Sequence, residues 1–560
     1  MIRNLIFFLI LTLPLIAAAD SSYTLSRMAH PTPGAEEAIM LPSPIEDYES
    51  AMRQLEAEGW LDGDRTPPAD PQLGDTWDWY IWDLGGMPVA NLLPCTVRGL
   101  GNNIYVVVED SQWNVNIDQT DVDTIVDHFD NVSVGNFPDQ GIWDLNTSHF
   151  GDPPNFDGLD RIFFLYYEFN ISADGFFWVY DQFPDGSQPW ASNEADVIYL
   201  ATDSGNCASN YLMAVGAHEF EHLIHFNQDQ NEDTWLDEGM GEFAMWLFGN
   251  PDNISSFNTN PDNSLVSWGS SWADYIQTYL WTLYIYEQFG GQQVIWDTVH
   301  DPINGMNSYQ AVINNLGYGD EVEDIFNNWS VANYLDEPGI YYGQYGYQGD
   351  TLPPFSAWRF ISTFPSSGNG SVQDWASEYM RIVDGSDGAA PHITIDGSDI
   401  HDFRVTIMGV DAALSTVVIE LELDASESVS YTFMEGAAHD EVVVSVASTT
   451  LTGTGSYTYS VESVPTDGPE LPSSAQLFSA YPNPFNPSTQ FSVKLNRGGE
   501  VGVEIFDLNG RRVDSIAKTH MDAGEHRIDW VAENLPSGVY MARLSRDGKL
   551  LSSQKLVLAK

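Results

Sequence analysis

The sequence predicts a multidomain chain in which an α+β domain is followed by a β-sandwich and a small Ig-like antiparallel β domain. Its 560 residues exceed what a single hydrophobic core organises. Between residues 75 and 345, strand-like segments come first and helical segments follow, which is typical of α+β domains. From residue 346 onward, short alternating β segments separated by turns dominate the pattern.

Residues 1–19 have the pattern of a secretory signal peptide. Arg3 precedes a short apolar run that ends in three alanines, Ala17 to Ala19. The alternative is a transmembrane anchor, but the run is short for a span and lacks a basic flank after it. Residues 20–74 are polar and rich in proline, with one helical pattern at 46–60. We expect this region to be a pro-segment or a disordered lead, and the mature chain to have no transmembrane anchor.

The α+β domain is expected over residues 75–345. Segments rich in Val, Ile, Tyr and Phe predict strands at 103–109, 161–169 and 195–202. Apolar periodicity and acidic first turns predict helices at 120–132, 211–227, 234–248 and 272–289.

Two β domains are expected after it. Period-2 alternation in "STVVIELEL" and "EVVVSVAS" predicts a β-sandwich over 346–463, followed by a linker at 464–476. Residues 477–560 hold all five lysines and carry a net charge of +2, whereas the rest of the chain carries −63. A charge change this abrupt indicates a separate module with a separate role.

The overall charge and the cysteine content limit the partners and the compartment. A net charge of −61 argues against nucleic acids and anionic membranes as partners. An exported chain with two cysteines, Cys95 and Cys207, is compatible with one disulfide or with two buried thiols.

The segment "HEFEHLIHF" (218–226) contains the strongest chemical signal. On a helix, His218 and His222 stand at i and i+4, so both imidazoles lie on one face and can chelate one metal ion. Glu219 lies beside that ion without pointing at it. This is the H-E-x-x-H arrangement, in which zinc activates a water molecule and the glutamate accepts its proton.

A zinc site of this kind needs a third protein ligand. His225 is roughly 10 Å along the helix from His218, which is too far for one ion to reach both comfortably. The second helix, "TWLDEGMGEFAMWLF", carries Glu238 and Glu242 at i and i+4. If the two helices are antiparallel, Glu238 supplies the third ligand, and Glu242 orients a ligating histidine through its far nitrogen.

These residues resemble a known family. "HEFEH…WLDEGMGEF" resembles the gluzincin metallopeptidases, and its short gap is similar to that of the hyicolysin-type and immune-inhibitor-like secreted peptidases. The resemblance implies a zincin-like fold, zinc at His218, His222 and Glu238, and Glu219 as the general base. Asp237 departs from the Asn found in zinc aminopeptidases. Their G-x-M-E-N motif is also absent, which favours endopeptidase activity over N-terminal trimming.

Two further assignments rest on weaker patterns. The helix at 272–289 resembles a tyrosine-bearing helix of related peptidases, which suggests Tyr275, or else Tyr279, as the oxyanion donor; core packing is the alternative role. The loop "DPPNFDGLDR" (152–161) carries oxygen ligands at a spacing that suits Ca²⁺, although a solvated acidic turn explains the pattern as well.

The last module resembles the C-terminal sorting domain of type IX secretion cargo. The opening "YPNPFNPST", the turn "DLNGRR" and the closing "LPSGVY" and "KLVLAK" occur in the expected order. The resemblance implies passage across the inner and outer membranes of a Gram-negative-type bacterium, and the type IX machinery as a partner.

Taken together, the patterns favour a secreted zinc endopeptidase that acts on proteins or peptides. An inactive surface adhesion or matrix-binding protein on a peptidase fold, and an aminopeptidase, remain as alternatives. Zinc content and cleavage of a denatured protein distinguish the enzymes from the binding protein.

Overall fold

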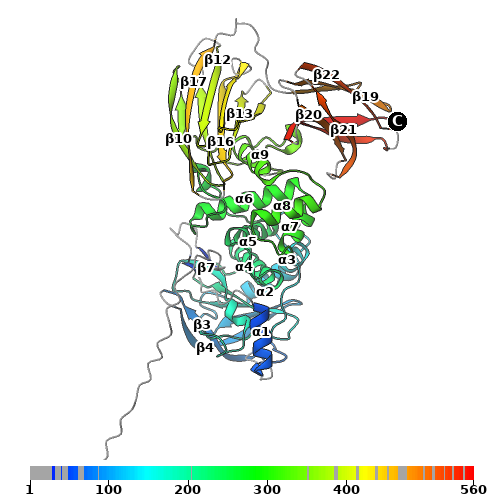
Figure 1. Ribbon diagram of the computed structural model, residues 1–560. Coiled ribbons are helices and arrows are strands. Elements are labelled where there is room, and N and C mark those ends of the chain that lie inside the picture. The colour runs from blue at the N-terminus through cyan, green and yellow to red at the C-terminus, as the bar shows by residue number, and fades with distance from the viewer. Residues whose placement is uncertain are drawn as a thin grey trace, which may run out of the picture.

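The structure is a computed structural model. It describes residues 28–31, 39–40, 48–60, 68–85, 88–203, 205–349, 352–383, 389–411, 415–434, 439–450, 453–464, 476–495, 499–507, 511–521, 524–532, 535–546 and 549–560. The predicted signal peptide and most of the predicted linker lie outside these residues. The chain is multidomain and mixes helices with sheets, and it ends in a β-rich domain (Figure 1).

An eight-stranded mixed sheet forms one end of the molecule, with the strand order β2-β1-β7-β8-β6-β5-β4-β3 (Figure 1). The central strands β5, β6 and β8 are parallel, and β6 (IFFLYY) is buried along its whole length, as expected for a strand covered on both faces. The strands are β1 Met28–Pro31, β2 Ile39–Met40, β3 Thr76–Asp83, β4 Val89–Leu100, β5 Ile104–Glu109, β6 Ile162–Tyr167, β7 Ala173–Phe177 and β8 Val197–Ala201.

The predicted pro-segment or lead contributes to this sheet. Within it, β1 pairs antiparallel with β7, with His30 opposite Gly175 and Pro31 opposite Ala173. The predicted helix at 46–60 is present as α1 (Tyr48–Ala57). Sequence periodicity did not predict β7, because a five-residue strand with an internal glycine carries too little pattern.

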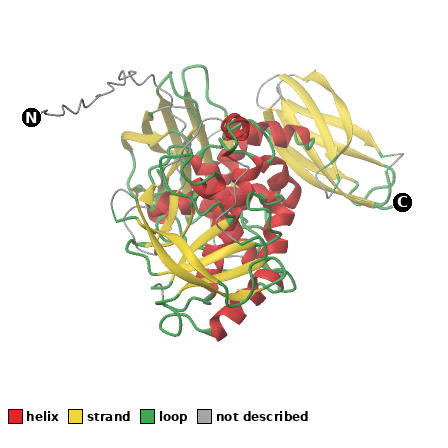
Figure 2. Cartoon of the chain, turned by 90° about the horizontal axis from the view of Figure 1, so that it is seen from below, coloured by secondary structure: helices red, strands yellow, loops and turns green. Residues whose placement is uncertain are grey.

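Helices occupy the middle of the molecule, between the sheet and the later β domains (Figures 1 and 2). They are α2 Gln119–Asp130, α3 Ile142–Phe150, α4 Asn210–Gln228, α5 Thr234–Phe248, α6 Trp272–Gln288, α7 Gln292–Val299, α8 Met306–Asn315 and α9 Val322–Leu335. The two helices expected to carry the histidines and glutamates are α4 and α5. Ser209 caps α4 by accepting a hydrogen bond from the Leu212 amide.

Two glycines let α4 lie close against the sheet. A Cβ on Gly216 of α4 would stand 2.7 Å from Cε2 of Phe164 in β6. A Cβ on Gly175 of β7 would stand 2.7 Å from Val215 and 3.0 Å from Cγ of Glu219, both on α4. The helix with the H-E-x-x-H residues is therefore seated directly on β6 and β7.

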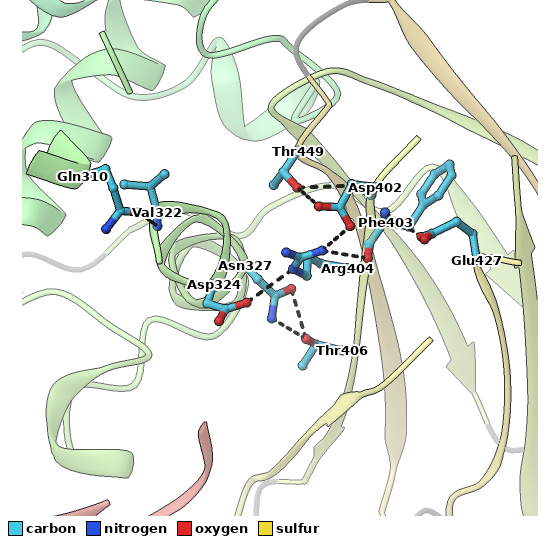
Figure 3. Close-up of polar contacts among 10 residues, drawn as sticks. All are labelled: Gln310, Val322, Asp324, Asn327, Asp402, Phe403, Arg404, Thr406, Glu427 and Thr449. Atoms are coloured by element: carbon cyan, nitrogen blue, oxygen red, sulfur yellow. Dashed lines mark hydrogen bonds and ion pairs between the residues drawn. The ribbon is translucent and has the colours of Figure 1, made fainter. Parts of the chain in front are cut away.

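A two-sheet sandwich follows the helices, with strand orders β10-β17-β12-β15 and β14-β13-β16-β11-β9. Its strands are β9 Arg359–Ile361, β10 Ser366–Gln373, β11 Ala376–Val383, β12 Ala390–Gly397, β13 Phe403–Val410, β14 Val417–Leu421, β15 Ser428–Thr432, β16 Glu441–Ser448 and β17 Thr454–Val464. The sandwich is fastened to α9: Asn327 Nδ2 donates to Thr406 Oγ1 at 3.0 Å, and Arg404 pairs with Asp324 (Figure 3). Trp375 and Tyr379 of the sandwich belong to the same hydrophobic cluster as the helices.

The C-terminal module, predicted at 477–560, has two sheets, β18-β19-β22 and β21-β20-β23-β24, and its first strand begins one residue earlier, at Gln476. Its strands are β18 Gln476–Tyr481, β19 Ser488–Leu495, β20 Gly499–Phe506, β21 Arg512–Met521, β22 Gly524–Val531, β23 Gly538–Arg546 and β24 Lys549–Leu558. Its buried apolar residues form a hydrophobic cluster of their own, which includes Phe491, Val503 and Leu556.

Cys95 and Cys207 are both free and buried, so of the two alternatives the structure has thiols and not a disulfide. Cys95 Sγ lies 3.5 Å from the Leu93 carbonyl oxygen, and Cys207 Sγ lies 3.5 Å from that of Asn116. Burial raises the pKa of both thiols, that of Cys207 to about 12, so both remain protonated and unreactive at neutral pH.

Candidate metal centre

Helices α4 and α5 pack face to face and run antiparallel. His218 contacts Glu242 and Glu238, His222 contacts Glu238 and Asp237, and His225 contacts Asp237. Residues of increasing number along α4 thus contact residues of decreasing number along α5, as antiparallel helices require. The contacting side chains are all buried, with exposures of 0–1%.

Three side chains converge at the centre of this helix pair. His218 Nε2 lies 3.4 Å from Glu238 Oε2, and His222 Nε2 lies 3.6 Å from the same oxygen. The two imidazole rings stand almost perpendicular, with centroids 4.6 Å apart. Ligand atoms about 2.0–2.1 Å from a tetrahedral zinc ion stand roughly 3.3 Å from one another, so this donor set fits such an ion.

The remaining nitrogen of His218 faces a second carboxylate. Nδ1 lies 3.4 Å from Glu242 Oε1, which leaves Nε2 directed at Glu238. A glycine makes room for the ring, because a Cβ on Gly241 would stand 2.8 Å from its Nε2 and Cε1 atoms. Glu242 and Gly241 thus both lie against the His218 ring.

His222 has an equivalent arrangement that sequence reasoning did not assign. Its Nδ1 lies 3.4 Å from both Asp237 Oδ1 and Glu221 Oε2. His225 joins the same two carboxylates, with Nδ1 at 3.1 Å from Glu221 and 3.2 Å from Asp237. The available signal was the presence of two carboxylates, Glu221 and Asp237, in helices whose other residues are mostly apolar.

The electrostatics of this cluster favour positive charge at its centre. Burial alone would lower the pKa of His222, but Asp237 and Glu238 outweigh it and hold that pKa well above the usual value. Burial would raise the pKa of Glu238, but His222 and His218 lower it instead. The pKa of His225 rises to about 10 because Glu221 and Asp237 outweigh burial. Imidazolium protons or a divalent cation can supply that charge.

The predicted catalytic residues lie at the same place. Glu219 is completely buried, on the face of α4 that contacts Gly175 of β7. Tyr275 of α6 is also buried, and its pKa is raised well above the usual value by burial and then by Glu238, Glu242 and Glu219. Its hydroxyl therefore stays protonated close to three carboxylates, as a hydrogen-bond donor must.

Two other tyrosines lie on α6 and α4. Tyr279, the alternative donor, is buried one helical turn further along α6 than Tyr275. Tyr211, two turns before His218 on α4, was not singled out from the sequence. Its hydroxyl donates to Asp174 Oδ2 at 2.9 Å, and Glu242 contributes to raising its pKa, after burial, Asp174 and Asp252.

In the loop at 152–161, suggested for Ca²⁺, the Asp157 carboxylate accepts hydrogen bonds from backbone amides. Asp157 Oδ1 accepts from the Leu159 amide at 2.9 Å, and its Oδ2 accepts from the Asp196 amide at 3.2 Å. Within the described part of the chain, two groups of three His, Cys, Asp or Glu side chains have metal-ligand spacing, and neither lies in this loop. They are His218, His222 and Glu238, and Glu221, His222 and Asp237.

The C-terminal module matches a known family. Residues 479–559 match the secretion system C-terminal sorting domain. This match indicates type IX secretion to the cell surface or the extracellular medium, and it implies contact with that secretion machinery. None of the helices that the structure describes is both long and apolar enough to cross a membrane.

One similar protein is the neutral metalloprotease ShpI of Staphylococcus hyicus. It is 25% identical over 212 residues, which takes in 32% of this chain and 48% of the relative. The chain thus spans about half the length of the curated relative that it matches. Together with the sorting-domain match, this similarity supports a secreted, metalloprotease-like protein.

Similarities to solved structures are weak. Dimeric latent PorU from Porphyromonas gingivalis has 14% identity and a TM-score of 0.15, covering 37% of this chain and 19% of that chain. The adhesin domain of Epf from Streptococcus pyogenes has 10% identity and a TM-score of 0.13, covering 34% and 77%. Scores this low carry no argument about fold or function.

Proposed function

We propose that this chain is a secreted zinc-dependent endopeptidase of the gluzincin type, with a zincin-like catalytic domain. The observation that carries the proposal is the spacing of His218 Nε2, His222 Nε2 and Glu238 Oε2. These atoms belong to buried side chains with 3.4 and 3.6 Å between the nitrogens and the shared oxygen. Their chemistry and their spacing both suit zinc.

The roles of the residues follow from their positions. His218, His222 and Glu238 hold the ion, Glu242 orients His218, and Asp237 with Glu221 orients His222. A bound zinc ion supplies Lewis-acid activation of water and of the scissile carbonyl. Glu219 accepts the proton of the attacking water and passes it to the leaving amine. The Tyr275 hydroxyl donates a hydrogen bond to the oxyanion that develops on the carbonyl oxygen.

We further propose that the lead segment keeps this enzyme latent. Strand β1 pairs with β7, and β7 contacts α4 at Glu219. An extended peptide reaching Glu219 could pair with the same edge of β7, so β1 and a substrate would compete for its backbone groups. The complete burial of Glu219 and Tyr275 in the full chain supports this proposal.

Hydrolysis of casein by the purified chain, with and without chelator, tests the activity. We expect chelator-sensitive cleavage, a rate that rises when residues 20–47 are deleted, and equal cleavage of peptides with free and blocked amino termini. Dependence on a free amino terminus would indicate an aminopeptidase. Zinc binding without any cleavage, in either form of the chain, would indicate the adhesion or matrix-binding alternative.

A further inference from the structure

The contact between the C-terminal module and the rest of the chain is ionic. We call residues 28–464 the body. Arg543 Nη1 lies 2.9 and 2.8 Å from the two carboxylate oxygens of Asp320, in the loop between α8 and α9. Arg546 Nη2 lies 2.5 Å from Oε1 of Glu422, just after β14. One strand, β23, thus contacts both the helical layer and the sandwich.

Both arginines have further contacts or are buried in the folded chain. The guanidinium of Arg543 lies over the ring of Phe506, 4.9 Å from its centroid. The side chain of Arg546 is 1% exposed, which is exceptional for arginine and requires a carboxylate partner. On the body, Gln310 fixes the loop of Asp320 by donating to the Asp320 carbonyl at 3.2 Å. Gln310 also accepts a hydrogen bond from the Val322 amide at 2.9 Å (Figure 3).

None of the three hydrophobic clusters of the described residues spans this contact, and Phe506 of the module is buried outside all of them. The hydrophobic cluster of the module contains no body residue, and the two clusters of the body contain no module residue. The charges, in contrast, are complementary, because residues 477–560 carry +2 and the remainder carries −63. Attraction between opposite charges therefore contributes to the association, and salt should weaken that contribution.

We propose that Asp320 and Glu422 form an acidic docking surface on the body for Arg543 and Arg546 of the C-terminal module. The docking is reversible and is controlled by ionic strength, because the module has its own core and is tethered through the connection at 465–475.

Small-angle X-ray scattering of the full chain tests the proposal independently of its enzymatic function. Glu219→Gln is used as the background to prevent self-cleavage. At roughly 0.05 M salt we expect a compact particle, and at roughly 0.5 M a larger radius of gyration, since salt screens the partly exposed pair of Arg543 with Asp320 and the long-range attraction between module and body. The double variant R543E/R546E should show the larger radius at both salt concentrations.

Two further experiments distinguish loss of docking from misfolding: a control with the same change of charge, and an exchange of the charges within one ion pair. R511E/R527E makes the same change of charge at arginines that are exposed on the same module, and it should stay compact at low salt. R543D alone should open the particle, and D320R/R543D should close it again. An unchanged radius in R543E/R546E would overturn the proposal, and so would opening by the control variant or failure of the exchange to restore compactness.

Discussion

Two buried polar clusters lie in different parts of the chain, one beside β8 and one between α4 and α5, and their contacts differ. In the loops beside the sheet, Asp181 accepts from the Asn193 amide at 2.5 Å and from the Tyr199 hydroxyl at 2.5 Å. Between α4 and α5, the closest approaches around His218 and His222 are 3.4–3.6 Å. The first cluster satisfies its carboxylate with hydrogen bonds, whereas the second holds donor atoms at the spacing of metal ligands. Short internal bonds indicate a structural role for the first cluster, whereas the spacing of His218 Nε2, His222 Nε2 and Glu238 Oε2 is compatible with the proposed metal site.

Removing a proposed metal ligand should have the largest effect, because it should abolish both zinc binding and hydrolysis. We expect Glu238→Ala to lose zinc and all hydrolysis, because two imidazoles alone hold the ion weakly. Zinc content after dialysis and the rate of casein cleavage measure both losses. Glu238→Gln serves as a second variant that keeps the volume of the side chain. If His225→Ala strips the metal while Glu238→Ala retains it, the third ligand has been assigned wrongly.

Removing the proposed general base should lower the rate without removing the ion. Glu219→Gln should bind zinc at full stoichiometry and reduce kcat by about 10²–10⁴, which is the typical contribution of positioned proton transfer. A steady-state assay beside a metal analysis checks both parts. Undiminished kcat would contradict the mechanism.

Loosening the orientation of His218 should have a smaller effect. Glu242→Ala should weaken zinc affinity by about 10–100-fold, as is typical of residues that orient a metal ligand. Gly241→Ala should also weaken it, because the new Cβ would meet the His218 ring at 2.8 Å, although alanine suits a helix better. Competition with a chelator of known affinity measures the zinc affinity of each variant. If the affinity is unchanged in both variants, other contacts orient His218.

Titration of the hydrogen-bonded cluster around Asp181 should alter the stability of the fold and leave zinc binding unchanged. Burial raises the pKa of Asp181 from its usual value of 3.8 to about 8, and burial also raises the pKa of Asp157. Because the folded state holds these protons more tightly, their stabilising contribution is complete below about pH 4 and is lost as the pH rises through about 8. Melting temperatures should therefore fall from pH 5 to pH 8.

Asp181→Asn tests this cause directly. It removes one titrating group, costs about 1 kcal/mol at pH 5, and should reduce the fall in melting temperature between pH 5 and pH 8. Zinc affinity should not change. The exposed Asp139 provides a matched control, since Asp139→Asn should leave the pH dependence as it was. If the melting temperature falls equally in Asp181→Asn and in the unaltered chain, the pH dependence of stability arises from other groups.

Local features of the sequence determined the parts of this protein that depend on short-range geometry. An i, i+4 spacing places two imidazoles on one helix face wherever the helix lies, so His218 and His222 could be paired without a structure. Glu238 and Glu242 were paired in the same way. Alternation of apolar residues, together with the change of charge near residue 477, indicated the later β domains. The sorting-domain match at 479–559 bears out the sequence motifs of the last module.

Tertiary structure alone decided which side chains meet across elements. The pairing of Asp237 and Glu221 with His222 depends on how α5 rotates against α4, and Gly241 matters only because the His218 ring lies against it. The pairing of β1 with β7, the separate burial of Cys95 and Cys207, and the contact of Arg543 with Asp320 join residues far apart in the chain. Sequence periodicity reports which face of an element is buried, but the partner on that face is chosen by packing and charge in the folded chain.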